Sequence, residues 1–177
     1  KEGLLNLNQK LHFPLLPKRI AIISADSSKG LSDFLQVLQE NEKSYFIFTH
    51  LFNAYLQGDV AVQSIISALK KIKRVKDYFD IVIIVRGGGA EVGMTCYNNY
   101  DLCKAIAEFP LPVLTGIGHS TNLNVAEMVS FRNEITPTKL AEFLLQTFRE
   151  FEQETKRLNR EMIAHSLQII DKTDTNI

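Results

Sequence analysis

The sequence has few of the features that mark several common classes of protein. It contains two cysteines, Cys96 and Cys103, which show no CxxC or Cys/His spacing of the kind that binds metal. We therefore expect reduced thiols in a cytoplasmic protein rather than disulfides or a zinc site. There is no apolar run of about 18 residues and no signal-peptide pattern, so we expect no membrane segment. Internal repeats and low-complexity tracts are also lacking.

The sequence also lacks three well-known motifs of nucleotide-binding proteins and hydrolases. No GxxxxGK[ST] occurs, so there is no P-loop. The glycines do not follow GxGxxG in the first strand–helix unit, which argues against a dinucleotide site. The GxSxG turn of serine hydrolases is absent as well. A function must therefore come from other loops.

Net charge is lacking too, because 20 lysines and arginines balance 20 aspartates and glutamates. Any affinity for nucleic acid must come from a local basic patch. One basic cluster ends a predicted helix, where cations complement the helix dipole; the alternative is a nucleic-acid patch. Its members are Lys70, Lys71, Lys73, Arg74 and Lys76.

Apolar runs alternate with segments of helical spacing. Four runs, at residues 19–24, 45–49, 81–85 and 111–117, predict buried strands. Helices are expected through Leu31 to Leu38, after Gly58, and over residues 100–108, 124–131 and 139–171. This alternation is typical of βαβ crossovers. The predicted fold class is α/β, a three-layer domain with a mostly parallel sheet and a long C-terminal helix.

Three regions are expected along the 177 residues, a length that suits one domain with an appended helix. Residues 1–16, punctuated by Pro14 and Pro17, are interpreted as a linker or the end of a preceding segment. Residues 17–138 form the α/β domain. Residues 139–177 begin a helical arm longer than a compact domain needs, which suits partner binding or a coiled coil.

Two glycine-rich turns follow predicted strands: Arg86-Gly87-Gly88-Gly89 and Gly116-Ile117-Gly118-His119. Ligands of open α/β sheets bind beyond the carboxyl ends of the strands. A guanidinium, glycine amides and an imidazole at that edge favour an anion site. The alternatives are a turn that needs positive φ with Arg86 in solvent, and a structural histidine.

The segment after the first strand is a second candidate for anion binding. Residues 24–29 are small and polar, include Ser24 and Ser27, and precede a helix whose N-terminus attracts anions. Asp33, one turn into that helix, either orients a base or serves as a first-turn carboxylate. Glu127 and Glu142 form no acidic pair, so spacing gives two-metal chemistry no support.

Several short segments together resemble the large subunit of exonuclease VII. They cover about residues 15–145, in the order and at the spacing of that family. The segments are Pro17–Ser24, Asp33, Gln57-Gly58, Arg86-Gly87-Gly88-Gly89-Ala90, Pro112–His119, Thr136-Pro137-Thr138 and Ala141-Glu142.

The resemblance implies a nuclease-like catalytic domain at residues 17–138 that hydrolyses single-stranded DNA to oligonucleotides. It implies catalytic roles for Asp33, Arg86 and His119, small subunits gathered by the C-terminal helix, and no essential metal or other cofactor. No OB-fold, which the family carries at its amino terminus, is recognisable. Substrate contacts are expected from Ser24, Ser27, Gly87, Gly88, Gly89, Gly118, Ser120 and Asn122.

The chain departs from the family after the fourth strand. The family has Gly-His-Glu-x-Asp, whereas this chain places Ser120 and Asn122 at the two acidic positions. An asparagine cannot hold an imidazolium as a carboxylate does. Either the protein is a weakened or inactive relative that binds DNA as a scaffold, or Glu91 or Glu127 replaces the lost acid. A third hypothesis, a generic nucleotide-binding domain, has only the analogy of fold behind it.

Aromatic and basic side chains offer further, less specific candidates. Base stacking is conceivable for Tyr55, Tyr97 and Tyr100, although packing is the ordinary role of such rings. Contacts to backbone phosphates are conceivable for a set of cations that otherwise belong to solvated surface. These are Lys29, Lys104, Lys139 and Arg132.

Overall fold

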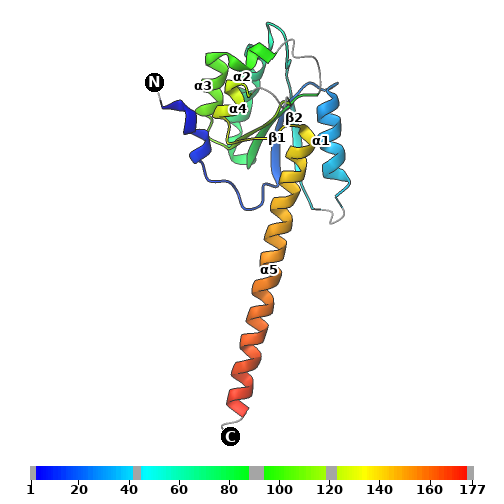
Figure 1. Cartoon of the computed structure of the whole chain (residues 1–177), viewed down its shortest axis with the longest axis vertical. Helices are drawn as coiled ribbons and strands as arrows, with labels where there is room; N and C mark the ends of the chain where they lie inside the picture. Colours follow the sequence, from blue (N-terminus) through cyan, green and yellow to red (C-terminus); the bar gives the residue numbers. More distant parts are fainter. Residues whose placement is uncertain (1–2, 42–44, 88–93, 119–122, 175–177) are drawn as a thin grey trace.

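The protein consists of an α/β head from which one long helix projects (Figure 1). The computed structural model describes residues 3–41, 45–87, 94–118 and 123–174, with side chains to residue 168. The projecting helix, α5, spans Pro137–Asp174 and carries the chain's C-terminal end far from the head. The predicted α/β class with a long C-terminal helix is confirmed.

A single five-stranded sheet organises the head. Its spatial order is β2-β1-β3-β4-β5, and all four pairings are parallel. The carboxyl ends of all the strands therefore meet at one edge. The strands are β1 (Arg19–Ser24), β2 (Phe48–Asn53), β3 (Ile81–Val85), β4 (Val113–Gly116) and β5 (Arg132–Asn133).

Helices cover both faces of the sheet, which gives three layers. On one face lie α1 (Lys29–Gln39) and the first turns of α5; on the other lie α2 (Ala61–Arg74), α3 (Tyr100–Ala107) and α4 (Val125–Val129). Alternate residues of β1 enter the two cores: Ile20 and Ile22 pack with α1, and Ala21 and Ile23 with α2. Burial on both faces explains why the inner strands are continuously apolar.

Two strands differ from the sequence-based prediction. The second strand begins at Phe48 rather than residue 45 and continues to Asn53. It is an edge strand, so only part of its surface is buried and its polar residues weakened the apolar signal. The two-residue β5 was missed, because a pair of polar residues, Arg132 and Asn133, has no detectable period.

The amino-terminal segment packs against the head. Two 3₁₀ turns, η1 (Leu4–Asn6) and η2 (Asn8–Lys10), lie beside α3 and α4. Asn8 is fully buried; its amide donates to the carbonyl oxygens of Phe109 and Leu111, and its side-chain oxygen accepts from the amide of Val113. Residues 1–16 therefore include a docked element, while the proposed domain boundaries stay a prediction.

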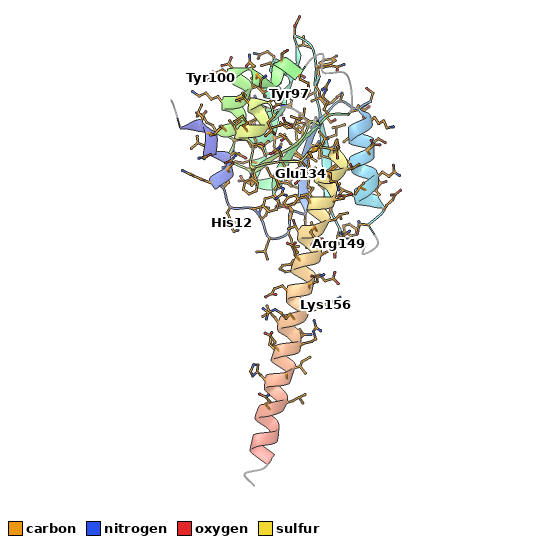
Figure 2. All side chains as sticks on the ribbon, in the orientation of Figure 1. His12, Tyr97, Tyr100, Glu134, Arg149 and Lys156 are labelled. Carbon is orange, nitrogen blue, oxygen red and sulfur yellow. The ribbon has the colours of Figure 1, made fainter. Side chains whose placement is uncertain are left out.

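The helix α5 has two parts with different surroundings. Its first turns pack on the sheet through Leu140, Ala141, Leu144 and Leu145, and the next turn buries Phe148 against Tyr45. From Gln153 to Gln168 every residue is exposed, and ion pairs such as Lys156–Glu152 and Arg157–Glu161 stabilise the helix locally. Figure 2 shows the change, with Arg149 beside the head and Lys156 on the projecting part.

The arm leaves the head at the edge where the strands begin. The helix starts at the opposite edge, because a Cβ on Gly116 would lie 3.2 Å from Pro137. By its fourth turn it reaches Tyr45, which precedes β2. The Tyr45 ring stacks on Phe148 at 5.2 Å, and its hydroxyl donates to Glu152 at 2.7 Å. The arm and the carboxyl edge of the sheet thus lie at opposite ends of the head.

Candidate active site

A cavity of about 710 Å³ opens where β1, β2 and β3 end. This is the edge at which open α/β sheets bind ligands. Its walls come from three segments: the β1–α1 turn, the chain after β2 and the chain after β3. The polar residues among its lining are Asp26, Ser27, Ser28, Lys29, Asn53, Tyr55, Gln57, Ser64 and Arg86, with Gly87 beside them.

Arg86 supplies a buried positive charge to this cavity. It directly follows β3, and its side chain is 5% exposed. One guanidinium nitrogen, Nη2, donates to Oε1 of Gln57 at 3.3 Å, and Nη1 donates to the sulfur of Met94. Two contacts from different segments fix the plane of the guanidinium. Such a preoriented fork suits the bidentate recognition of phosphate.

The first glycine after Arg86 is explained by packing between β3 and α1. A Cβ on Gly30 would lie 2.5 Å from the carbonyl oxygen of Arg86, and one on Gly87 would lie 2.7 Å from the amide of Gly30. The amide of Gly87 donates to the hydroxyl of Ser28, the N-cap of α1, at 3.0 Å. The turn therefore holds Arg86 against the start of α1. Gly88 and Gly89 lie outside the described residues.

The two serines predicted after β1 have different positions. Ser24 is fully buried, and its hydroxyl donates to the carbonyl oxygen of Val85 at 2.8 Å, which ties the end of β1 to the end of β3. Ser27 is exposed and lines the cavity together with Lys29. Ser27 thus forms part of the cavity wall, whereas Ser24 supports the strand that carries Arg86.

Asp33 lies on α1, away from the lining of the cavity. It is half-buried and stands one turn before Val37, on the same side of the helix. Val37 faces α5, because it lines a second hollow with Glu142 and Leu145. Arg86, by contrast, points toward Gln57 and Met94. The described residues therefore do not bring Asp33 and Arg86 into contact.

The remaining predicted site residues follow β4. Gly118 has a φ of 73°, and a Cβ there would lie 3.0 Å from the carbonyl oxygen of Ile135. A glycine is needed at that position for both reasons. His119, Ser120 and Asn122 lie outside the described residues, so their convergence with Arg86 stays a prediction.

Glu127, one of the two acids considered as a replacement, caps α4. Its carboxylate accepts from the amide of Asn124 at 3.0 Å, and the Asn124 side chain accepts from the amide of Glu127 at 3.0 Å. This reciprocal pair is a capping box. Burial raises the pKa of Glu127, while the bonds from Asn124 lower it. The carboxylate is therefore committed to the helix terminus; the other candidate, Glu91, lies outside the described residues.

Only some of the aromatic and basic candidates lie at the cavity. Tyr97 is fully buried and donates to the carbonyl oxygen of Leu56 at 3.0 Å, which is a packing role. Tyr55 at the cavity is 70% exposed, and Tyr100 is 55% exposed. Lys29 lines the cavity. The other cations pair locally: Lys104 with Glu108, Lys139 with Glu142 and Arg132 with Glu134.

Gln57 is the site residue that sequence analysis missed. The Gln57-Gly58 pair contributes to the resemblance, but no role was assigned to it. The available signal was Gly58, whose φ of 79° marks a tight turn after β2. Only the folded chain shows that this turn brings the Gln57 amide to Arg86.

Within residues 3–41, 45–87, 94–118 and 123–174, no group of three or more His, Cys, Asp or Glu side chains is arranged to hold a metal ion. No helix in the same part of the chain is long and apolar enough to cross a membrane.

Fold and cavity together define a class: a three-layer α/β domain with a parallel sheet, whose carboxyl edge presents a buried arginine to a polar cavity. The family model described as "Exonuclease VII, large subunit" matches residues 4–177. The chain therefore belongs to the exonuclease VII large-subunit family.

Similar proteins from several bacteria share the name exodeoxyribonuclease 7 large subunit. The protein from Lactobacillus gasseri is 34% identical over 81% of this chain, that from Campylobacter lari 31% over 93%, and that from Clostridium tetani 30% over 85%. The matched regions cover 31%, 43% and 37% of those proteins, respectively. The chain thus spans less than half the length of these relatives.

Proposed function

We propose that this chain is the catalytic part of an exodeoxyribonuclease that hydrolyses phosphodiester bonds of single-stranded DNA to oligonucleotides. The observation that carries the proposal is the buried Arg86, held by Gln57 at the mouth of a polar cavity. A guanidinium in this setting matches the charge and geometry of a phosphodiester. The names of the relatives supply the reaction type.

In this proposal Arg86 and the amides of Gly88 and Gly89 stabilise the charge that develops on the scissile phosphate. Water attacks phosphorus, the bond to the leaving oxygen breaks, and His119 transfers the proton between water and leaving group. Asp33 orients His119 or the water. The path of the DNA strand is lined by Ser27, Gly87, Gly118, Ser120 and Asn122. Ser24 supports this lining indirectly, through its hydrogen bond to the carbonyl oxygen of Val85.

The first test is cleavage of end-labelled single-stranded DNA by the purified protein in the presence of a chelator. We expect oligonucleotide products under these conditions, because the proposed groups need no metal. Duplex DNA of the same sequence is the control and should resist cleavage. Activity that appears only after magnesium is added would contradict this mechanism. Binding of mononucleotides without binding of oligonucleotides would instead favour a generic nucleotide-binding domain.

A second function is favoured by one observation, the replacement of the family's acids by Ser120 and Asn122. Here the chain binds single-stranded DNA as a scaffold and cleaves it weakly or not at all. Loss of a carboxylate that supports a histidine lowers rates by about 10⁴-fold in well-studied cases while geometry is kept.

The Asn122→Asp variant distinguishes the two functions. The active enzyme should already cleave well and gain less than about tenfold, whereas a disarmed pocket should gain about 10²-fold or more. The measurement is the initial rate on labelled single strands. Asn159→Asp, the same change on the exposed arm, is the matched control and should leave the rate unaltered.

We further propose that the arm recruits small subunits. The first apolar stripe of α5 continues beyond the head at spacings of seven and four through Phe151, Leu158 and Met162, which are 37%, 47% and 69% exposed. This period is typical of a helix that packs against another helix. The two cysteines, both free thiols, agree with a cytoplasmic location.

A further inference from the structure

A basic and aromatic surface lies at the edge where the strands begin, opposite the cavity. It gathers the starts of β1 and β2, the end of α2 and the 3₁₀ turn η3 (Lys76–Tyr78). We call it the basic–aromatic surface. Its members are Lys18, Arg19, Phe48, Lys73, Arg74, Lys76 and Tyr78, all of them exposed.

Direct contacts join these segments. The guanidinium carbon of Arg19 lies 5.5 Å from the centre of the Tyr78 ring, and Arg19 also pairs with Asp80 at 3.1 Å. The rings of Phe48 and Tyr78 meet edge to face at 5.7 Å. These two rings remain 46% and 48% exposed. Two rigidly held rings beside cations provide the combination that binds single strands, in which bases stack and phosphates pair.

The charge of this surface exceeds what the helix dipole explains. Residues 70–80 contain five cations and two acids, although the whole chain has no net charge. The last turn of α2 accounts for Lys71, Lys73 and Arg74 as dipole partners. Lys76 lies beyond the helix, Arg19 begins β1 and Lys18 directly precedes it. Cations from three elements thus converge on one surface, which is the electrostatic footprint of a polyanion site.

The edge strand β2 connects this surface to the cavity. It is first in the strand order, so one of its sides is an edge of the sheet. Phe48 starts it within the basic–aromatic surface, and Asn53 ends it in the wall of the cavity. Between them the exposed His50 packs against Phe52 at 5.0 Å. Five residue steps of extended chain span about 17 Å, a short distance for a polynucleotide.

We propose that single-stranded DNA runs along β2 from the basic–aromatic surface into the cavity, so that this surface is a second binding site about 17 Å from the reacting phosphate. The proposal rests on the function proposed above, and it adds where the substrate strand lies. Bases stack on Phe48 and Tyr78, while Lys73 and Lys76 contact phosphates. The cavity then receives the strand past Tyr55.

A membrane surface is a poorer match for the same cations. An interfacial helix must insert an apolar face into lipid. The apolar face of α2, including Ile65, Leu69 and Ile72, is already buried against the sheet. The exposed side of α2 consists of polar and charged residues, and the neighbouring rings of Phe48 and Tyr78 are held edge to face. Stacked bases match such rings better.

The test compares oligothymidines of about 4 and about 20 nucleotides, lengths that bracket typical single-strand sites. The variant is Lys73→Ala with Lys76→Ala, which alters two exposed side chains only. The matched control is Lys10→Ala with Lys156→Ala, on η2 and the arm α5, away from β2. Dissociation constants are measured over a series of salt concentrations, together with cleavage rates and with binding to vesicles that contain phosphatidylserine.

For the long oligonucleotide we expect the variant to bind about tenfold more weakly, with a salt slope lower by about 1.4, which corresponds to two lost phosphate contacts. The short oligonucleotide should bind and be cleaved as before, because it reaches only the cavity. An equal loss at both lengths, an equal loss in the control, or no loss would overturn the proposal. So would a loss confined to vesicle binding. Failure of the unaltered chain to bind either oligonucleotide would instead refute the proposed function.

Discussion

Replacing Arg86 by lysine should lower the rate of single-strand cleavage by about 10²–10³-fold, the usual loss when one donor to a developing oxyanion is removed. Lysine keeps the positive charge but loses the planar fork, so it cannot hold a phosphate through two parallel hydrogen bonds in the plane that Gln57 fixes. The loss should appear mainly in kcat, because the fork acts on the reacting phosphate. Single-turnover rates on labelled DNA measure it.

The matched control for this prediction is Arg132→Lys. Arg132 is an exposed arginine on β5 that pairs with Glu134 and lies over the Phe143 ring, outside the cavity. Its replacement should leave cleavage within about twofold, in keeping with the small effect of most exposed substitutions. If Arg86→Lys cleaved at the unaltered rate while its unfolding curve stayed normal, the cavity around Arg86 would not be the place of reaction.

The parts of the fold that sequence analysis predicted well are those whose pattern reflects a single dominant force. β1 and β3 are buried on both faces, so their apolar runs locate them to the residue. The edge strand β2 has no continuous apolar run, because one of its sides is exposed to solvent and its residues are only partly buried. The docking of Asn8 depends on carbonyl groups about a hundred residues away, and no local pattern reports a bond of that range.

The candidate site shows the same division. A strand that ends in Arg86 and glycines could be placed at the carboxyl edge from sequence, because parallel strands all end there. The hydrogen-bond partners of the individual side chains could not be predicted from sequence. The Ser24 hydroxyl donates to the carbonyl oxygen of Val85, and the Gly87 amide donates to the hydroxyl of Ser28. Both hydrogen bonds join segments that are far apart in the sequence. Glu127 differs, since the Asn124-to-Glu127 spacing was itself a readable cap signal.

The contacts of Arg86 show how the candidate site is held rigid. Arg86 is fixed at its tip by Gln57, whereas its backbone is fixed by β3, by the amide-to-carbonyl bond to Gly116 at 3.2 Å and by the contact with Gly30. These partners belong to different segments at the carboxyl edge: β3, the end of β4, the start of α1 and the chain after β2. A catalytic group needs support of this kind, because a displacement of about 1 Å can cost about 10²-fold in rate.

The strongest test of that rigidity is Gly30→Ala. At an ordinary helical position this change stabilises a protein by up to about 1 kcal/mol. Here the new Cβ would lie 2.5 Å from the Arg86 carbonyl oxygen and 2.6 Å from the Gly87 nitrogen, both backbone atoms. We therefore expect the opposite sign, a loss of about 2 kcal/mol in the free energy of unfolding, measured from the urea midpoint at constant m-value.

The same substitution should also reduce cleavage by about 10²-fold or more, since α1 and the Arg86 turn cannot both keep their places. Ser32→Ala, on the exposed side of α1, is the control; it keeps the helix and should change the unfolding free energy by less than about 0.5 kcal/mol. A Gly30→Ala protein that is more stable than the parent and equally active would mean that the contact between α1 and the Arg86 turn is looser than described. The rigid support of Arg86 would then have to come from its other contacts, among them those with Gln57, Met94 and Gly116.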